Sequence, residues 1–274
     1  MHDLVIRGGV IVDGSGAEKA TGDVAIDGDR LSQVGGTAGA AREEIDADGA
    51  VVAPGWVDIH THYDGQVTWD PHLTPSGWHG VTTAIMGNCG VGFAPVAPDA
   101  HDQLIRLMEG VEDIPGSALA AGIKWDWESF PEYLDALDAM PRSLDVGTQV
   151  PHGAIRTYVM GDRGATNQPA NPDDMAGMAD IVEQGLKAGA LGFSTSRTML
   201  HRSLDGEPVP GTFAGADELM AIGQGMKRAG HGVFELATDF GLGGMGGKFG
   251  EDMDWMVRLA KDTGLLVTFI LGQA

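Results

Sequence analysis

The segment Pro54–Gln66, PGWVDIHTHYDGQ, joins an apolar run to two histidines separated by one residue. The run at 55–60 is typical of a strand, in which residues i and i+2 point to the same side. His60 and His62 would then converge on one cation, and zinc and related divalent metals accept neutral imidazole well. The segment therefore predicts a metal site at a strand end, with two partly exposed histidines in a turn as the alternative. We expect Asp64 to be a further ligand or to orient one imidazole from outside the metal's ligand set.

A second strand is predicted at 81–88, VTTAIMGN, and Cys89 follows it in the polar turn GNCG. Because adjacent parallel strands lie about 4.8 Å apart, the ends of these two strands should be close together. A thiolate there would join the two imidazoles around one metal or bridge two metals, whereas a small buried core residue is the alternative. Cys89 is the only cysteine, which excludes an internal disulfide and fits a reducing cytoplasm.

Beyond these two strands, strand-like and helix-like segments alternate along the chain. Apolar runs lie at 143–150, 190–196, 232–238 and 265–271, and helical periodicity is found at 127–140, 172–189, 216–230 and 251–264. This alternation predicts an α/β fold, with a parallel sheet covered by helices. The segments 89–126 and 197–215 are expected to be long irregular loops on the carboxyl side of strands, where α/β enzymes build active sites.

Residues 1–53 have a different pattern, with short alternating strands separated by turn sequences such as DGSG and DGDR. They predict a small antiparallel sheet in a domain of its own, followed by a barrel-type domain at 54–274. About six strand–helix units are present, whereas a closed (β/α)₈ barrel has eight. The chain also ends just after its last apolar run. We therefore expect an incomplete barrel from a longer protein, rather than an open sheet.

Charge and hydropathy narrow the class of partner. The formal net charge is −22, which should repel nucleic acid and anionic membrane surfaces. The chain does not begin like a signal peptide, and no apolar run reaches the roughly 18 residues of a transmembrane helix. We expect a cytoplasmic protein that acts on a small molecule. An incomplete barrel would expose apolar edges, so a homo-oligomer is also possible.

These motifs carry a family resemblance. PGWVDIHTHYD resembles the first-strand motif of the amidohydrolase superfamily, and GVTTAIMGNCGVGFAP resembles its D-aminoacylase branch, the N-acyl-D-amino-acid deacylases. WESFPEYLDALD, VPHGAIR and GALGFSTS continue this resemblance in the same order. It implies a TIM-like barrel with a small β-sandwich formed by both chain ends. It also implies a zinc-dependent hydrolase, with one or two ions, that deacylates N-acyl-D-amino acids. His60, His62 and Cys89 are the metal ligands that it implies.

The sequence departs from that branch at three places. The histidines that the family carries on the fifth and sixth strands are absent from GVFELATDF (232–240) and from VTFILGQA (267–274). Glu235 or Asp239 would be the substitute on the fifth strand, because carboxylate oxygen also binds zinc. The family's general-base aspartate on the eighth strand would lie beyond Ala274.

Basic residues follow the third and fourth strands. Arg197 and His201 lie in a polar loop and are candidates for binding a substrate carboxylate, with local pairing to acidic residues as the alternative. His152 would face the same mouth or be structural. The glycine-rich stretch 241–250 lacks the Gly-Lys-Ser/Thr ending of a phosphate loop and is interpreted as a mobile loop.

Two other functions remain open. The first is a cyclic-amide hydrolase of the dihydroorotase or hydantoinase kind, which the resemblance would associate with a carbamylated lysine on the fourth strand. The segment ALGFSTS (190–196) contains no lysine. The second is a non-catalytic relic that binds only a metal or a partner, which the missing histidines favour.

Overall fold

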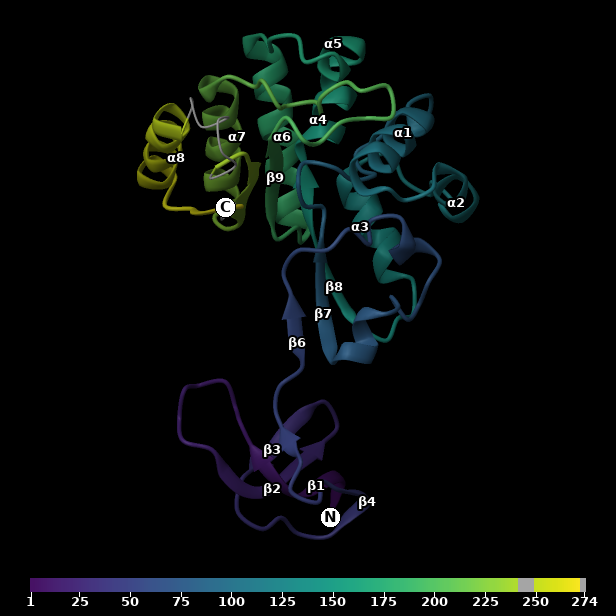
Figure 1. Cartoon of the computed structure of the whole chain (residues 1–274), viewed down its shortest axis with the longest axis vertical. Coiled ribbons are helices and arrows are strands. Elements are labelled where there is room, and N and C mark those ends of the chain that lie inside the picture. Colours follow the sequence, from purple (N-terminus) through teal and green to yellow (C-terminus); the bar gives the residue numbers. More distant parts are fainter. Residues whose placement is uncertain (241–248, 272–274) are drawn as a thin grey trace. The chain divides into compact units, whose positions relative to one another are not determined.

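The computed structural model describes residues 1–240 and 249–271. The chain divides into two compact units, Met1–Trp56 and Val57–Ala274 (Figure 1). Within the described ranges, no helix has the length and hydropathy required to span a bilayer.

The smaller unit is one five-stranded sheet. Its strands are β1 (His2–Ile11), β2 (Ala20–Asp27), β3 (Arg30–Val34), β4 (Ala41–Asp46) and β5 (Val51–Val52). The order is β3-β2-β1-β4, and β5 also pairs with β1. Strands β1, β2 and β3 are antiparallel neighbours, but β4 and β5 run parallel to β1.

The expectation of a small antiparallel sheet is therefore confirmed for β1, β2 and β3 and wrong for β4 and β5. After β3 the chain crosses the sheet to the free edge of β1. No local turn signal in the sequence indicates this crossing. The described residues of this unit form a single sheet, so the sandwich stays a prediction.

The larger unit contains a six-stranded sheet with the order β11-β10-β9-β8-β7-β6. Its strands are β6 (Trp56–Asp58), β7 (Val81–Met86), β8 (Asp145–Pro151), β9 (Gly192–Arg197), β10 (Val233–Thr238) and β11 (Leu266–Phe269). The pairs from β7 to β11 are all parallel. The carboxyl ends of successive strands therefore meet along one edge, and the predicted α/β sheet is confirmed.

Four helices lie where the periodicity predicts them. They are α3 (Phe130–Asp138), α6 (Pro172–Ala188), α7 (Ala216–Ala229) and α8 (Phe249–Thr263). Capping boxes start two of them, Ser129 with Glu132 at α3 and Asn171 with Asp174 at α6. Gly230 ends α7 in the left-handed conformation that glycine adopts readily.

Further helices occupy segments that the sequence left as loops. They are α1 (His101–Glu112), α2 (Gly116–Gly122), α4 (His152–Met160) and α5 (Asp162–Ala165), with short 3₁₀ turns η1 (Gln66–Thr68) and η2 (Ser76–His79). The expectation of an irregular segment at 89–126 is wrong, because α1 and α2 lie inside it. Both helices pack into the core through leucines such as Leu104 and Leu119.

The helices cover one face of the sheet and form the main core. Phe193 and Phe234 on neighbouring strands are fully buried and pack against each other with tilted rings, 4.9 Å between ring centroids. Side chains on the opposite face are more accessible, including Leu191 and Leu266. The sheet is therefore anchored from its helical side, and the strand ends carry the polar residues described next.

Candidate metal centre

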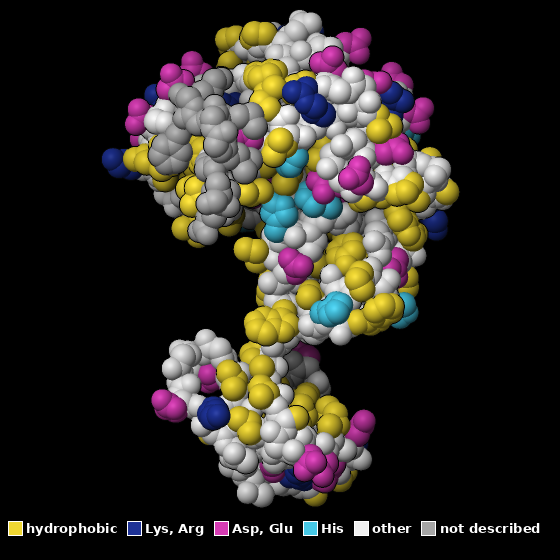
Figure 2. Space-filling model, viewed as in Figure 1, with side chains coloured by type: hydrophobic (Ala, Val, Ile, Leu, Met, Phe, Trp, Pro, Cys, Tyr) yellow, Lys and Arg dark blue, Asp and Glu magenta, His cyan; other side chains and the backbone are white. Residues whose placement is uncertain are grey.

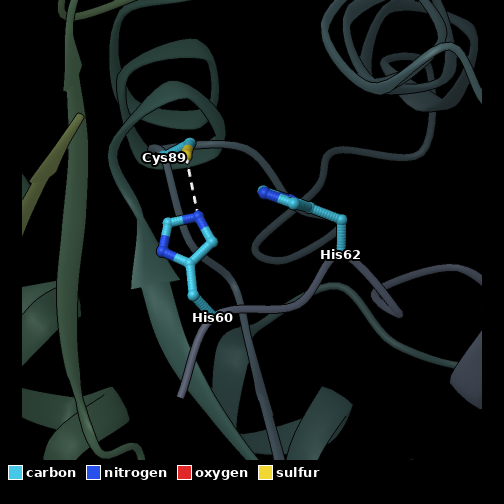
Figure 3. A group of neighbouring side chains, drawn as sticks. All are labelled: His60, His62 and Cys89. Atoms are coloured by element: carbon cyan, nitrogen blue, oxygen red, sulfur yellow. Dashed lines mark hydrogen bonds between the residues drawn. The ribbon is translucent and has the colours of Figure 1, made fainter. Parts of the chain in front are cut away.

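His60, His62 and Cys89 come together as the two motifs predict. One nitrogen from each histidine and the Cys89 sulfur all lie within 4.8 Å of one another. The closest pair is Cys89 Sγ and His60 Nε2, at 3.3 Å. Figure 3 shows His60 and His62 rising from the segment after β6, with ring nitrogens directed toward Cys89. In Figure 2, histidine side chains gather on one face of the larger unit.

This geometry fits zinc. Zinc binds imidazole nitrogen at about 2.0–2.1 Å and thiolate sulfur at about 2.3 Å, so ligand atoms around one tetrahedral ion lie about 3.3–3.6 Å apart. The sulfur–nitrogen pair is already at 3.3 Å, and all three ligand atoms lie within 4.8 Å of one another. A donor set of two imidazoles and one thiol also suits zinc better than it suits magnesium or calcium.

Thr61 explains why the two histidines share a side. Its backbone N–H and its hydroxyl both donate to the carbonyl oxygen of Ile85, at 2.9 and 2.8 Å. Buried Asn88 donates its amide to the Thr61 carbonyl at 3.1 Å. Thr61 is thus fixed against the end of β7, and the flanking histidines point the other way. Asn88 was not singled out from the sequence.

The turn that carries Cys89 is held from three neighbouring elements. Glu235 on β10 accepts the Cys89 N–H at 3.0 Å, and Ser194 on β9 accepts the Gly90 N–H at 2.9 Å. The Gly153 N–H at the start of α4 donates to the Gly90 carbonyl at 2.8 Å. Cys89 itself has φ of 56°, an uncommon conformation for a residue with a side chain. These contacts fix the sulfur beside the histidines.

Burial sets the protonation of the three candidate ligands. It lowers the pKa of His62 to about 3, with further lowering from the neighbouring charges of His60 and His201, and it lowers the pKa of His60 as well. Both imidazoles are therefore neutral near pH 7, as metal ligands must be. Burial and the carboxylates of Glu235, Glu112 and Asp64 raise the pKa of the Cys89 thiol far above its ordinary value. A bound cation would reverse that effect, because a coordinating thiol is deprotonated.

Three carboxyl groups surround the candidate ligands. Burial raises the pKa of Asp64 to about 8, and it raises those of Glu235 and Glu112 to about 7. Among the described residues, Asp64 Oδ2 and Glu235 Oε1 are buried without a hydrogen-bond partner. Glu112 Oε1 lies 3.4 Å from His62 Nε2. No sequence signal indicates Glu112, because its helix α1 lies in the segment interpreted as irregular.

His152 is not at the mouth of the site. It is fully buried, with Nδ1 2.8 Å from the Thr195 hydroxyl and Nε2 2.8 Å from Glu218. Arg156 donates to both carboxylate oxygens of the same Glu218. Burial lowers the pKa of His152, although the Glu218 hydrogen bond opposes this shift. The expectation that His152 faces the mouth is therefore corrected, since both ring nitrogens are engaged inside the protein.

The two other candidates for substrate binding differ in position. Arg197 is mostly buried and pairs with Asp252 at 3.2 Å, while it also donates to the carbonyl of Ala214 at 2.7 Å. Local pairing thus occupies much of its guanidinium. His201 lies 3.3 Å from the Ser196 hydroxyl, and its charge acts on His60 and His62, so it belongs to the surroundings of the metal centre.

Asp239, the other proposed substitute ligand, instead accepts hydrogen bonds from Thr198 and the Met199 N–H. The glycine-rich residues 241–248 and the terminal residues 272–274 lie outside the described residues.

Comparisons with known proteins identify the family of this chain. A family model described as "Amidohydrolase family" matches residues 43–274. A D-aminoacylase from Alcaligenes xylosoxydans xylosoxydans is 34% identical over 194 residues, covering 70% of this chain and 37% of that protein. A solved D-aminoacylase mutant in complex with CuCl₂ has a TM-score of 0.77 at 28% identity, covering 98% of this chain and 51% of that one.

A second solved relative is the N-acyl-D-glutamate deacylase from Bordetella bronchiseptica, complexed with zinc and a phosphonate inhibitor. It has a TM-score of 0.73 at 26% identity, and covers 97% of this chain and 50% of that one. This chain thus spans about half or less of the length of these relatives, and its six-stranded sheet corresponds to a curled half-barrel. With the match over residues 43–274 and the histidine–cysteine cluster inside it, the chain belongs to the amidohydrolase family.

Proposed function

We propose that this chain provides the metal-binding part of a zinc-dependent hydrolase that cleaves the linear amide bond of N-acyl-D-amino acids or related N-acyl compounds. The observation that carries the proposal is the cluster of His60, His62 and Cys89, with ligand atoms within 4.8 Å of one another. The names of the similar proteins, a D-aminoacylase and an N-acyl-D-glutamate deacylase, support the substrate class.

The residues of this chain have distinct roles in that proposal. His60 and His62 would hold a zinc ion together with the Cys89 thiolate. A bound zinc ion would lower the pKa of a water molecule toward neutrality and polarise the amide carbonyl. Glu235 fixes the backbone of Cys89 through one carboxylate oxygen, and its other oxygen is free to act toward a metal. We assign to His201 a hydrogen bond to the substrate carboxylate through a ring N–H.

The cyclic-amide alternative has weaker support. The fourth strand of the larger sheet, β9, reads GFSTSR and carries no lysine that carbon dioxide could modify. Experiment distinguishes the relic hypothesis from the enzyme hypothesis. Both allow metal binding, but only the enzyme hypothesis allows turnover.

Zinc content of the purified 274-residue chain tests the site. We expect at least one zinc ion per chain in the wild type, loss of zinc in Cys89→Ala, and wild-type zinc in His231→Ala, which alters an exposed histidine away from the cluster. A wild type without stoichiometric zinc would contradict the proposal.

Hydrolysis by the longer protein of which we propose this chain to be a part tests the activity, because the general-base aspartate that the family resemblance implies would lie beyond Ala274. N-acetyl-D-amino acids should be deacylated faster than their L-enantiomers or cyclic amides, and His60→Ala should abolish turnover. Zinc binding without any turnover would support the relic, and preference for a cyclic amide would support the hydantoinase-like alternative.

A further inference from the structure

Helix α1 delivers one carboxylate to the metal centre from outside the sheet. Leu104, Leu107 and Met108 bury one side of the helix in the core. At Gly110 the helix lies directly against the loop after β9, because a Cβ there would come within 2.4 Å of the Leu204 nitrogen. Glu112 is the last residue of the helix, and the backbone that carries it therefore cannot shift far.

The Glu112 carboxylate points to His62. Its Oε1 lies 3.4 Å from His62 Nε2, and both side chains are largely buried, at 19% and 17% exposed. Among the described residues, His62 is the one basic partner recorded within 4.0 Å of this carboxylate, and no lysine or arginine pairs with it. A largely buried carboxylate without a permanent cation is costly unless another positive charge is present.

The contact is not a hydrogen bond. Hydrogen bonds from N–H to oxygen are usually about 2.7–3.2 Å long with the hydrogen aimed at the acceptor. A separation of 3.4 Å instead matches the edge of a tetrahedral zinc site, because a nitrogen and an oxygen each about 2.0–2.1 Å from one ion lie about 3.3 Å apart. The oxygen is thus placed beside the ring nitrogen, as two ligands of one ion are.

We propose that Glu112 supplies the fourth ligand of the zinc ion held by His60, His62 and Cys89. The inference rests on the proposed metal site and extends it with a residue from a helix instead of a strand end. Glu112 is not yet part of the compact cluster of three ligands, so binding draws its flexible side chain inward while α1 stays in place. The protein ligands would then be two imidazoles, one thiolate and one carboxylate, and the water that the proposed hydrolysis uses would bind as a fifth ligand.

The test measures zinc affinity by competition with a chromophoric chelator. Glu112→Gln keeps the shape of the side chain but removes its charge, and we expect the dissociation constant to rise at least tenfold. Glu112→Asp should retain part of the affinity. Asp113→Asn is the matched control, because it removes an equal charge from the adjacent exposed residue, and its affinity should equal that of the wild type. Thermal melting of the metal-free variants checks that each one folds.

Cobalt substitution separates a ligand from a nearby charge. The visible spectrum of the cobalt-loaded protein reports the ligand set, so Glu112→Gln should change it and Asp113→Asn should not. An unchanged spectrum, even with weaker binding, would overturn the assignment of Glu112 as a ligand. Unchanged affinity in Glu112→Gln, with zinc still lost in His62→Ala, would overturn this inference alone. A wild type that binds no zinc would overturn the proposed function as well.

Discussion

Replacing Ser194 by alanine should loosen the turn that presents Cys89. Ser194 is fully buried on β9, and its hydroxyl oxygen accepts the Gly90 N–H at 2.9 Å while its hydrogen is donated to the Gly87 carbonyl. One side chain therefore satisfies a backbone donor and a backbone acceptor of the same turn. Alanine removes both bonds without adding any volume.

The expected cost follows from those two bonds. A buried hydrogen bond contributes about 1 kcal/mol net, but leaving its partner buried and unsatisfied costs about 1–3 kcal/mol. Because the Gly90 N–H and the Gly87 carbonyl both lose their partner inside the protein, we expect Ser194→Ala to lower the free energy of unfolding by about 2–4 kcal/mol. Zinc affinity should fall about tenfold, as is typical when a residue that orients a ligand is removed.

Urea unfolding of the metal-free protein, followed by tryptophan fluorescence, measures the stability change. Ser196→Ala is the control, because it makes the same substitution on the same strand and its hydroxyl contacts His201 instead of the turn. If Ser194→Ala lost less than about 1 kcal/mol, or no more than Ser196→Ala, the argument that β9 holds the Cys89 turn would be refuted.

Three other predictions concern the same framework. Glu218→Leu should cost about 3–5 kcal/mol, because it leaves Arg156 buried and unpaired, and adding Arg156→Met should recover most of that loss in the same urea assay. Gly90→Ala should lower the free energy of unfolding by more than Gly206→Ala does. Both glycines have positive φ, but of the two only Gly90 has backbone beside it, because a Cβ there would lie 2.9 Å from the Ser196 nitrogen. The contribution of His152 to stability should fall as pH drops from about 7 to 5.5, because its lowered pKa means that below its ordinary pKa of 6.5 the unfolded chain binds a proton that the native chain does not. The raised pKa values of Asp64, Glu112 and Glu235 act in the opposite direction, so this contribution is read from the difference between the wild type and His152→Gln. The lowered pKa of Glu218 acts in the same direction as that of His152 at lower pH, and His152→Gln should remove the His152 part of the slope near pH 6; an equal slope in this variant would contradict the assignment.

Local rules determined much of the larger unit. Capping boxes at Ser129 and Asn171 start α3 and α6 as the sequence predicts, because each needs only residues three positions apart. The alternation of strands and helices likewise predicts the sheet. Helix α1 was missed because its buried leucines lie between two loops and no capping side chain marks its start.

In the candidate metal centre, too, some features follow from local sequence and others only from tertiary structure. The HxH spacing and the adjacency of the first two strands predict that His60, His62 and Cys89 meet, so the sequence by itself determined three ligand candidates. The strand itself ends at Asp58, and the contact of Thr61 with Ile85 sets the two histidines on one side. Tertiary structure alone decided the rest. Glu112 reaches His62 from a distant helix, and His152 is buried against Glu218, 66 positions away in the chain. The periodicity of a segment reports which face is apolar, but a pairing across the fold depends on which distant segment packs there, and a single sequence does not encode that in any local pattern.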